Sequence, residues 1–195
     1  MIFDNWDQLE QAVSSCENCR LCETRIQTVL GAGNPKAPIL LVGEGPGENE
    51  DKQGIPFVGR GGQLLDKLLL HVGLSREKDV YITNMVKCRP PKNRNPMPDE
   101  QEACIDYLRS QTALIRPKII VCLGRIAACK LISPDFKVTS QHGQFFERNN
   151  VLLTATFHPA SVLRNPPQRG LTVDDFIAIK EKLDELLASE LGRDC

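Results

Sequence analysis

The sequence predicts an α/β protein, a three-layer α/β/α domain built on a central four-stranded, mainly parallel sheet. Four short apolar runs with β-type residues lie at 39–43, 80–83, 118–124 and 151–156, and segments with helical spacing separate them. The first run is continuously apolar, as expected of a strand that is covered on both faces. A length of 195 residues with 41% hydrophobic content fits one core. We therefore expect residues 1–195 to form a single domain.

The bulk composition limits the partners and the compartment. The formal net charge is −1, so binding to nucleic acid requires a local basic patch. The start, MIFDNWDQLE, has no basic and apolar signal region, and no apolar run approaches the ~18 residues of a membrane span. These features predict a cytoplasmic protein without a membrane partner, whose eight cysteines are reduced and available to a metal.

The first segment predicts a short helix followed by a cysteine motif. Trp6, Leu9 and Val13 have helical spacing within residues 4–15. Cys16 and Cys19 then form a C-x-x-C, which Cys22 extends to C-x-x-C-x-x-C. This spacing lets two thiolates converge on one ion or cluster, although an incidental pair is the alternative.

The first strand runs into a loop over residues 44–62 with six glycines, two prolines, four acidic residues and Phe57. A strand that feeds a glycine-rich loop is a common place for a pocket in an α/β protein. The acidic residues make it a poor site for a free phosphate, so we expect a neutral, flat ligand against Phe57. A helix follows at 64–72. Its N-terminal Gly61 and Gly62, beside Arg60, indicate either a phosphate contact or close packing of the helix on a strand.

The second strand ends at Asn84, and a proline-rich segment delays the next helix until Pro98. That helix is expected to run to about residue 114, with Cys88 before it and Cys104 inside it. The intervening loop is the most basic segment of the chain, which favours a wedge against a nucleic-acid backbone over a merely solvated loop; its cations are Lys87, Arg89, Lys92 and Arg94.

The last third predicts two strands and two helices. The strand at 118–124 leads into a helix through Ile132, with Cys122 and Cys129 as small buried hydrophobes. Residues 133–150 are expected to be irregular or to form a small hairpin, and 160–170 a loop. A terminal helix at 172–191 is expected to begin with Thr172 as N-cap and Asp174 and Asp175 in its first turn.

Polar side chains follow three of the four strands. Glu44 and Gly45 come after the first, Asn84 after the second and His158 after the fourth. Ligands of open parallel sheets bind beyond the carboxyl ends of the strands. An asparagine amide matches the edge of a nucleobase, Phe57 could stack on the base, and His158 could donate to an oxygen that gains negative charge.

Three ordered segments resemble a known family. VGEGPGENEDKQGIPFVG (42–59), TNMVKCRPP (83–91) and FHPASVLRNP (157–166) look like the motifs of a family 4 uracil-DNA glycosylase, and the similarity extends from Cys16 to the terminal helix. The resemblance implies an enzyme that flips uracil out of single- or double-stranded DNA and hydrolyses its N-glycosidic bond. A related subfamily that is trapped covalently on DNA carries a basic, histidine-containing insertion, and none follows Cys88, so we expect turnover. We also expect a monomer that acts at the nucleoid.

The resemblance also implies a cofactor. The family's cysteine pattern fits four residues of this chain and implies a [4Fe–4S] cluster that joins the N-terminal segment to residues 88–104; these residues are Cys16, Cys19, Cys88 and Cys104. Cys22 is then an extra cysteine. A structural zinc ion held by the same four thiolates is the alternative.

Roles within the site follow from the same comparison. Better-known uracil glycosylases place an Asp where this chain has Gly45, so Glu44 becomes the candidate for orienting water, while His158 and the Gly45 N–H stabilise the uracil oxygen. They place a Tyr that excludes thymine where this chain has Gly47, and Glu50 is the candidate replacement. The residues expected to contact DNA are Arg60, Gly61, Gly62, Arg89, Val162, Leu163 and Arg164.

Two other classes compete with this interpretation. A non-catalytic nucleic-acid-binding module with a cysteine-bound metal would bind DNA without releasing uracil. A nucleotide-binding α/β domain would use the glycine-rich loop for phosphates, but Glu44, Glu48 and Glu50 would then lie beside them.

Overall fold

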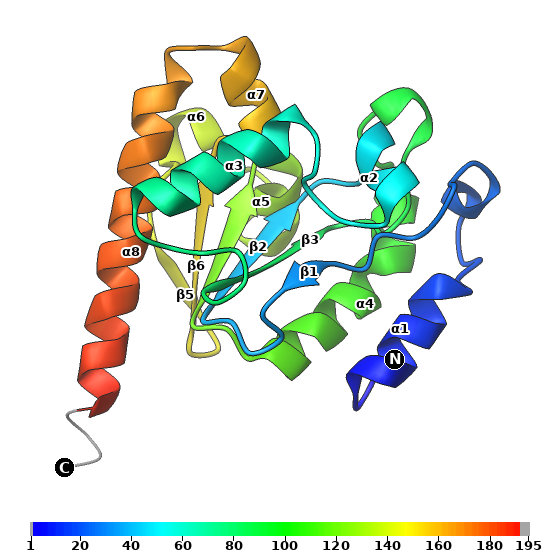
Figure 1. Ribbon diagram of the computed structural model, residues 1–195, viewed down its shortest axis with the longest axis horizontal. Helices are drawn as coiled ribbons and strands as arrows, with labels where there is room; N and C mark the ends of the chain where they lie inside the picture. The colour runs from blue at the N-terminus through cyan, green and yellow to red at the C-terminus, as the bar shows by residue number, and fades with distance from the viewer. Residues whose placement is uncertain (1, 192–195) are drawn as a thin grey trace.

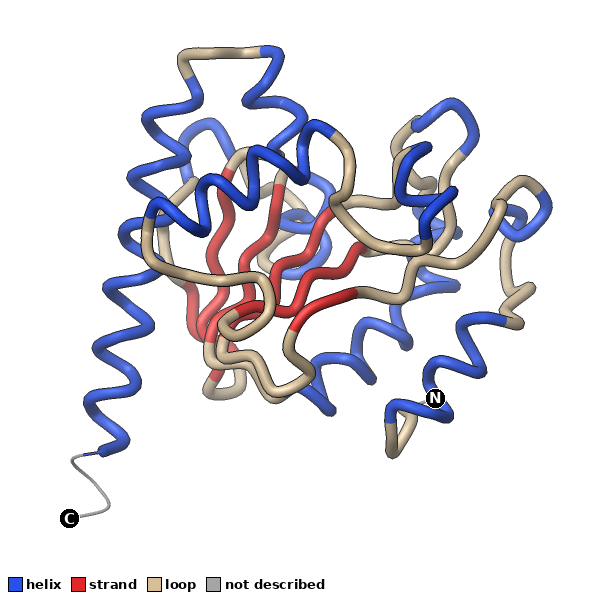
Figure 2. The backbone as a smooth tube through the Cα atoms, viewed as in Figure 1, coloured by secondary structure: helices blue, strands red, loops and turns tan. Residues whose placement is uncertain are grey.

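The computed structural model describes residues 2–191 and contains a six-stranded sheet with helices on both faces (Figures 1 and 2). The strand order is β1-β3-β2-β4-β6-β5. The four predicted strands form the parallel centre; they are β3 (Val80–Asn84), β2 (Ile39–Gly43), β4 (Ile119–Leu123) and β6 (Val151–Thr156). The predicted three-layer class is confirmed.

The sheet has two more strands than predicted. At its edges β1 (Ala32–Gly33) and β5 (Phe146–Arg148) pair antiparallel with β3 and β6. Two or three residues are too few to show the alternation that identifies a strand, so no periodic signal marks these two strands. Residues 133–150, expected to be irregular or a small hairpin, contain β5, whose hairpin partner β6 lies outside that range. They also contain an unexpected short helix at Val138–Gln141.

Successive residues of the central strands face opposite layers, as the pleat of a strand requires. Leu40 and Val42 pack in one core with Leu108 of α4. Ile39 and Leu41 pack in the other core, formed with α3 and α8. The helices are α1 (Trp6–Ser14), α2 (Glu48–Gln53), α3 (Arg60–His71), α4 (Pro98–Ile115), α5 (Arg125–Leu131), α6 (Val138–Gln141), α7 (Pro159–Arg164) and α8 (Gln168–Leu191), with short 3-10 turns at Arg20–Glu23 and Pro91–Asn93.

A third cluster attaches the N-terminal segment to the domain. Leu9 and Val13 of α1 are buried with Val86 and with Tyr107 of α4, and α1 lies beside α4 (Figure 1). Trp6 packs on Tyr81 with ring centroids 5.2 Å apart. This packing brings the segment after α1 to the start of α4.

Three expectations about helices were wrong. α8 begins at Gln168, so Thr172 is not its N-cap but a buried residue inside it, whose hydroxyl donates to the Gln168 carbonyl at 2.7 Å. Residues expected to form a loop contain α7, which starts at Pro159, a residue favoured in the first turn of a helix. The glycine-rich loop contains α2.

Within residues 2–191, the helices lack the combination of length and apolar character needed to cross a membrane.

Candidate active site and cysteine cluster

A pocket of about 940 Å³ opens at the carboxyl ends of the parallel strands. Segments that follow β2, β3, β4 and β6 line it. Figure 1 shows α2, α5 and α7 around this end of the sheet. It brings together most of the site residues expected from the sequence, namely Glu44, Gly45, Glu50, Phe57, Arg60, Gly61, Gly62, Asn84, His158 and Arg164. The predicted residues Arg89, Val162 and Leu163 do not line it.

Asn84 presents an unused acceptor to this pocket. Its side chain is 1% exposed, and its Oδ1 has no hydrogen-bond partner in the described part of the chain. A Cβ at Gly43 would lie 2.3 Å from this oxygen, so the missing side chain at Gly43 makes room for the amide. A buried acceptor without a donor costs about 1–3 kcal/mol. A ligand N–H at this position would remove that cost.

Phe57 is held in a conformation that few non-glycine residues adopt. Its φ is +54°, in the left-handed region, and its ring lies 5.7 Å from that of His158. The Arg76 guanidinium donates to the carbonyls of Pro56 and Phe57 at 3.0 and 2.9 Å. A Cβ at Gly62 would lie 1.7 Å from the Phe57 carbonyl oxygen. Gly62 therefore has the packing role, and Arg76 is a positioning residue that no sequence motif indicated.

Glu50 both braces the same loop and fills space beside Gly47. Its Oε1 accepts hydrogen bonds from the backbone N–H groups of Val58 and Gly59 at 3.0 and 2.9 Å. A Cβ at Gly47 would lie 2.6 Å from the Glu50 Oε2. The carboxylate thus occupies the volume into which a side chain at position 47 would extend.

His158 caps α7 and is held as one tautomer. Its Nδ1 accepts the Ala160 N–H at 3.2 Å, which leaves the proton of a neutral ring on Nε2. Burial, reinforced by the nearby Arg164 cation, lowers the pKa of His158 to about 4. At neutral pH the ring is therefore uncharged and has an Nε2–H donor.

Glu44 lies half-buried at the end of β2. Burial raises the pKa of its carboxyl group, while Arg125 acts in the opposite direction. Arg125 also lines the pocket and was not predicted, because it stands at the start of α5 outside any recognised motif. A Cβ at Gly45 would come within 2.9 Å of Val86 Cγ2, so the backbone is closely packed at this position.

The expected DNA-contacting residues separate into exposed and internal groups. Arg60 and Arg164 are exposed at the pocket, and Gly61 lies against Ala160. Val162 is 1% exposed and belongs to the core, so the expectation that it contacts DNA was wrong. Leu163 is half-buried on the other side of α7.

The basic loop is also less free than expected. Lys87 is 1% exposed and does not reach the surface; its Nζ donates to Thr83 Oγ1 and the Asn84 carbonyl, each at 2.7 Å. Arg89 contacts Asn93 at 2.7 Å and Glu48 at 3.5 Å. Arg94 is paired with Glu100 at 2.6 Å. Most of these cations are thus engaged within the protein, because the loop packs back on α2 and α4.

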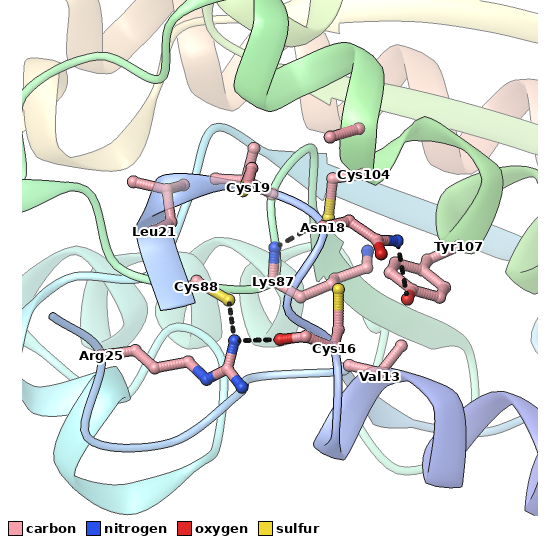
Figure 3. Close-up of a pocket in the computed structure, with 12 residues that line it drawn as sticks. Val13, Cys16, Asn18, Cys19, Leu21, Arg25, Lys87, Cys88, Cys104 and Tyr107 are labelled. Atoms are coloured by element: carbon pink, nitrogen blue, oxygen red, sulfur yellow. Dashed lines mark hydrogen bonds between the residues drawn. The ribbon is translucent and has the colours of Figure 1, made fainter. Parts of the chain in front are cut away.

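The four cysteines expected to act together line one small cavity (Figure 3). Cys16 and Cys19 come from the segment after α1, Cys88 from the loop after β3 and Cys104 from α4. Cys22 does not line this cavity. The predicted grouping of distant segments is therefore present.

Two of these four sulfurs accept hydrogen bonds from nearby N–H groups. Arg25 donates to Cys88 Sγ at 3.4 Å and to the Cys16 carbonyl at 2.6 Å, and the Lys87 backbone N–H donates to Cys104 Sγ at 3.3 Å (Figure 3). Burial raises the pKa of Cys88, and raises that of Cys104 to about 11. Such buried thiols are poor anions by themselves, and a bound cationic group is what would favour their thiolate forms.

The four thiols offer the kind of ligand that an iron–sulfur cluster takes. Among residues 2–191, no group of three His, Cys, Asp or Glu side chains could hold a metal ion as it stands. Four thiols around a shared cavity, with N–H donors to two sulfurs, match a group that takes one cysteine per iron.

The sequence of this chain is similar to those of known proteins. Residues 30–184 match the family model of the Uracil DNA glycosylase superfamily. A type-4 uracil-DNA glycosylase of Saccharolobus solfataricus is 46% identical over 190 residues, covering 93% of this chain and 88% of its own length. One from Archaeoglobus fulgidus is 45% identical over 187 residues, covering 92% and 94%. A type-5 uracil-DNA glycosylase of Thermus thermophilus is 37% identical over 119 residues, 54% of each chain.

Proposed function

Since the chain belongs to the type-4 branch of the uracil-DNA glycosylase superfamily, we propose that its strand-end pocket holds a flipped uracil, read by Asn84 and activated by His158. The protein is a monofunctional uracil-DNA glycosylase, which hydrolyses the N-glycosidic bond and leaves an abasic site in DNA. One observation carries the residue assignment: the buried Asn84 Oδ1 has no donor within the described residues.

Uracil has the pattern that this amide requires. Its N3–H would donate to Asn84 Oδ1, and its O4 would accept from the Nδ2 amide hydrogens. Cytosine offers an acceptor at N3 and a donor at N4, so both contacts would be reversed. A site built on such polar contacts discriminates by up to ~10⁴–10⁵. Phe57, fixed by Gly62 and Arg76, would provide the flat surface against the base.

His158 supports the departure of the base. When the bond between the sugar C1′ and uracil N1 breaks, its electron pair passes to the uracil and places negative charge on O2. The neutral ring with its proton on Nε2 is the donor that this oxygen needs. One such preorganised donor contributes about 10²–10³ in rate. Glu44 would hold the attacking water and, as a carboxylate, offset positive charge on the sugar. Burial raises its pKa, which makes the carboxylate a better acceptor for the proton of that water.

The cysteine cavity supports a [4Fe–4S] cluster bound by Cys16, Cys19, Cys88 and Cys104. When bound, this group would supply a covalent link between three segments distant in sequence. Its role in this account is structural: it holds the N-terminal segment against the loop after β3. We propose further that the enzyme acts as a monomer on DNA in the cytoplasm.

The function is tested with oligonucleotides that contain a single uracil or, as a control, a cytosine at the same position. We expect free uracil and alkali-sensitive abasic sites from the first only. DNA binding without free uracil would instead support a non-catalytic, metal-containing nucleic-acid-binding module and would contradict the proposal.

A further inference from the structure

A second groove, of about 400 Å³, lies beside the uracil pocket between α3, α7 and α8, three helices that contact one another (Figure 1). Its floor is apolar, with Leu64, Leu163 and Val173. No acidic side chain lines it. Its charged lining is entirely basic and consists of Arg60, Lys67 and Arg169, next to His71.

No carboxylate neutralises these cations, whereas ten other Lys and Arg side chains of the described residues form ion pairs. Arg20, Arg76 and Lys130, for example, are each paired with a carboxylate at 2.6–2.9 Å. Arg60, Lys67 and Arg169 are exposed and form no ion pair within residues 2–191. In a chain with a net charge of −1, unpaired cations gathered in one groove favour an anionic partner.

The groove is continuous with the proposed DNA interface. Arg60 lines both the groove and the uracil pocket. Ala160, Ser161 and Arg164 of α7 line the pocket, whereas Leu163 of the same helix lines the groove. α7 therefore forms a ridge with one binding surface on each side.

We propose that this basic groove binds the phosphate backbone of the strand opposite the uracil, an inference that rests on the proposed function. With the uracil strand in the pocket and α7 pressed against the duplex between its strands, the complementary strand comes to lie on the side of Leu163. Its phosphates then meet Lys67 and Arg169, and a single-stranded substrate leaves these residues unused.

The test compares wild-type protein with the double variant Lys67→Gln/Arg169→Gln on two substrates: a single-stranded oligonucleotide with one uracil and the same strand paired in a duplex opposite guanine. Both residues are exposed, so the variant should fold. Lys78→Gln is the matched control, because Lys78 is exposed just before β3, at the amino ends of the strands. Dissociation constants and single-turnover rates are measured at several salt concentrations.

For the double variant we expect duplex binding to weaken by roughly tenfold or more at 0.1 M salt. The plot of log K against log salt should become less steep, its negative slope shrinking in magnitude by about two. Single-strand binding and the rate at saturating DNA should stay within twofold of wild type, and Lys78→Gln should match wild type on both substrates. Equal losses on both substrates, or no loss on the duplex, would overturn the inference. The proposed function itself fails separately, if wild-type protein releases no uracil from either substrate.

Discussion

The proposed uracil pocket and the cysteine cavity lie on either side of one short segment, Asn84–Cys88, yet they are built in opposite ways. In the pocket, the buried Asn84 Oδ1 has no partner among the described residues, and Phe57 is held at a positive φ. In the cavity, Cys88 and Cys104 are buried and each receives a hydrogen bond. In the pocket a buried hydrogen-bond acceptor is left free for a substrate. In the cavity the hydrogen bonds to sulfur join segments that are distant in sequence.

Lys87 connects the two regions. Its backbone N–H donates to Cys104 Sγ, while its buried ammonium group donates to the Asn84 carbonyl. The end of β3 is thus anchored from the cavity side, which leaves the Asn84 side chain positioned on the pocket side. If this division is correct, changes in the pocket should abolish activity without loss of iron, and changes in the cavity should act through stability.

The largest expected effect is that of Asn84→Asp. The replacement offers two acceptors to a base edge that needs one acceptor and one donor, so uracil release should fall by roughly 10⁴-fold. The visible spectrum should match that of wild type. Some loss of thermal stability is expected because the new carboxylate is buried without a counter-charge, so activity is compared at a temperature where both proteins are folded. A loss below tenfold in single-turnover assays would show that Asn84 does not read the base.

On the cavity side, Cys88→Ala should lose iron and thermal stability together. Loss of a metal site is one of the few single changes that costs about 4 kcal/mol, or roughly 10 °C for a domain of this size. Cys22→Ala is the matched control and should keep both, because Cys22 does not line the cavity. Unchanged thermal stability of an iron-free Cys88→Ala protein would contradict the structural role.

His158→Gln should lower the single-turnover rate by about 10²–10³ with little change in DNA affinity, because the donor matters when charge develops on the uracil oxygen. Circular dichroism and DNA binding would verify that fold and interface persist. A raised dissociation constant with an unchanged rate would assign His158 to binding instead.

Glu50 tests how thymine is excluded. Glu50→Ala empties the space beside Gly47, and release of thymine from a T·G pair should rise by roughly 10–200-fold, the range associated with one methyl group in a pocket. Glu50→Gln keeps the volume and should still reject thymine. If Glu50→Ala ignores thymine as wild type does, another residue excludes the methyl group.

The smallest expected effect is on the pH dependence of stability. In the unfolded chain His158 takes up a proton near its ordinary pKa of 6.5, whereas the folded protein holds the pKa at about 4. The stability that depends on the neutral ring is present above pH 6.5 and is lost as the pH falls toward 4. Between pH 7 and pH 5, wild type should lose roughly 1–2 kcal/mol more than His158→Gln in urea unfolding. Equal losses of unfolding free energy in wild type and His158→Gln would show that another group is responsible for the pH dependence.

The sequence predicted what depends on continuous patterns. The four apolar runs became the parallel strands, and the residues at their carboxyl ends, Asn84 and His158 among them, meet in one pocket. Spacing alone indicated the pair Cys16 and Cys19, and the family resemblance anticipated that Cys88 and Cys104 share a cavity with them. Arg76 and Lys87 were not assigned their roles, because each acts through tertiary hydrogen bonds that no local spacing encodes.

The errors have similar physical causes. Val162 lies in a motif expected to press on DNA, but α7 turns that side chain into the core. Thr172 resembles an N-cap, yet the preceding residues continue the helix and its hydroxyl bonds within it. In each case the sequence showed which residue stands at the position. The direction of its side chain depends on where the helix begins, and the sequence did not settle that start.

The most direct test of the account is an X-ray structure of the protein with bound uracil, with data collected at the iron absorption edge. The account predicts the uracil N3 within about 3 Å of Asn84 Oδ1, the ring against Phe57, and an anomalous signal among Cys16, Cys19, Cys88 and Cys104. Uracil bound elsewhere, or with Asn84 Oδ1 facing a protein donor, would contradict the assignment of the pocket. A single zinc ion among the four cysteines would contradict the assignment of the cavity.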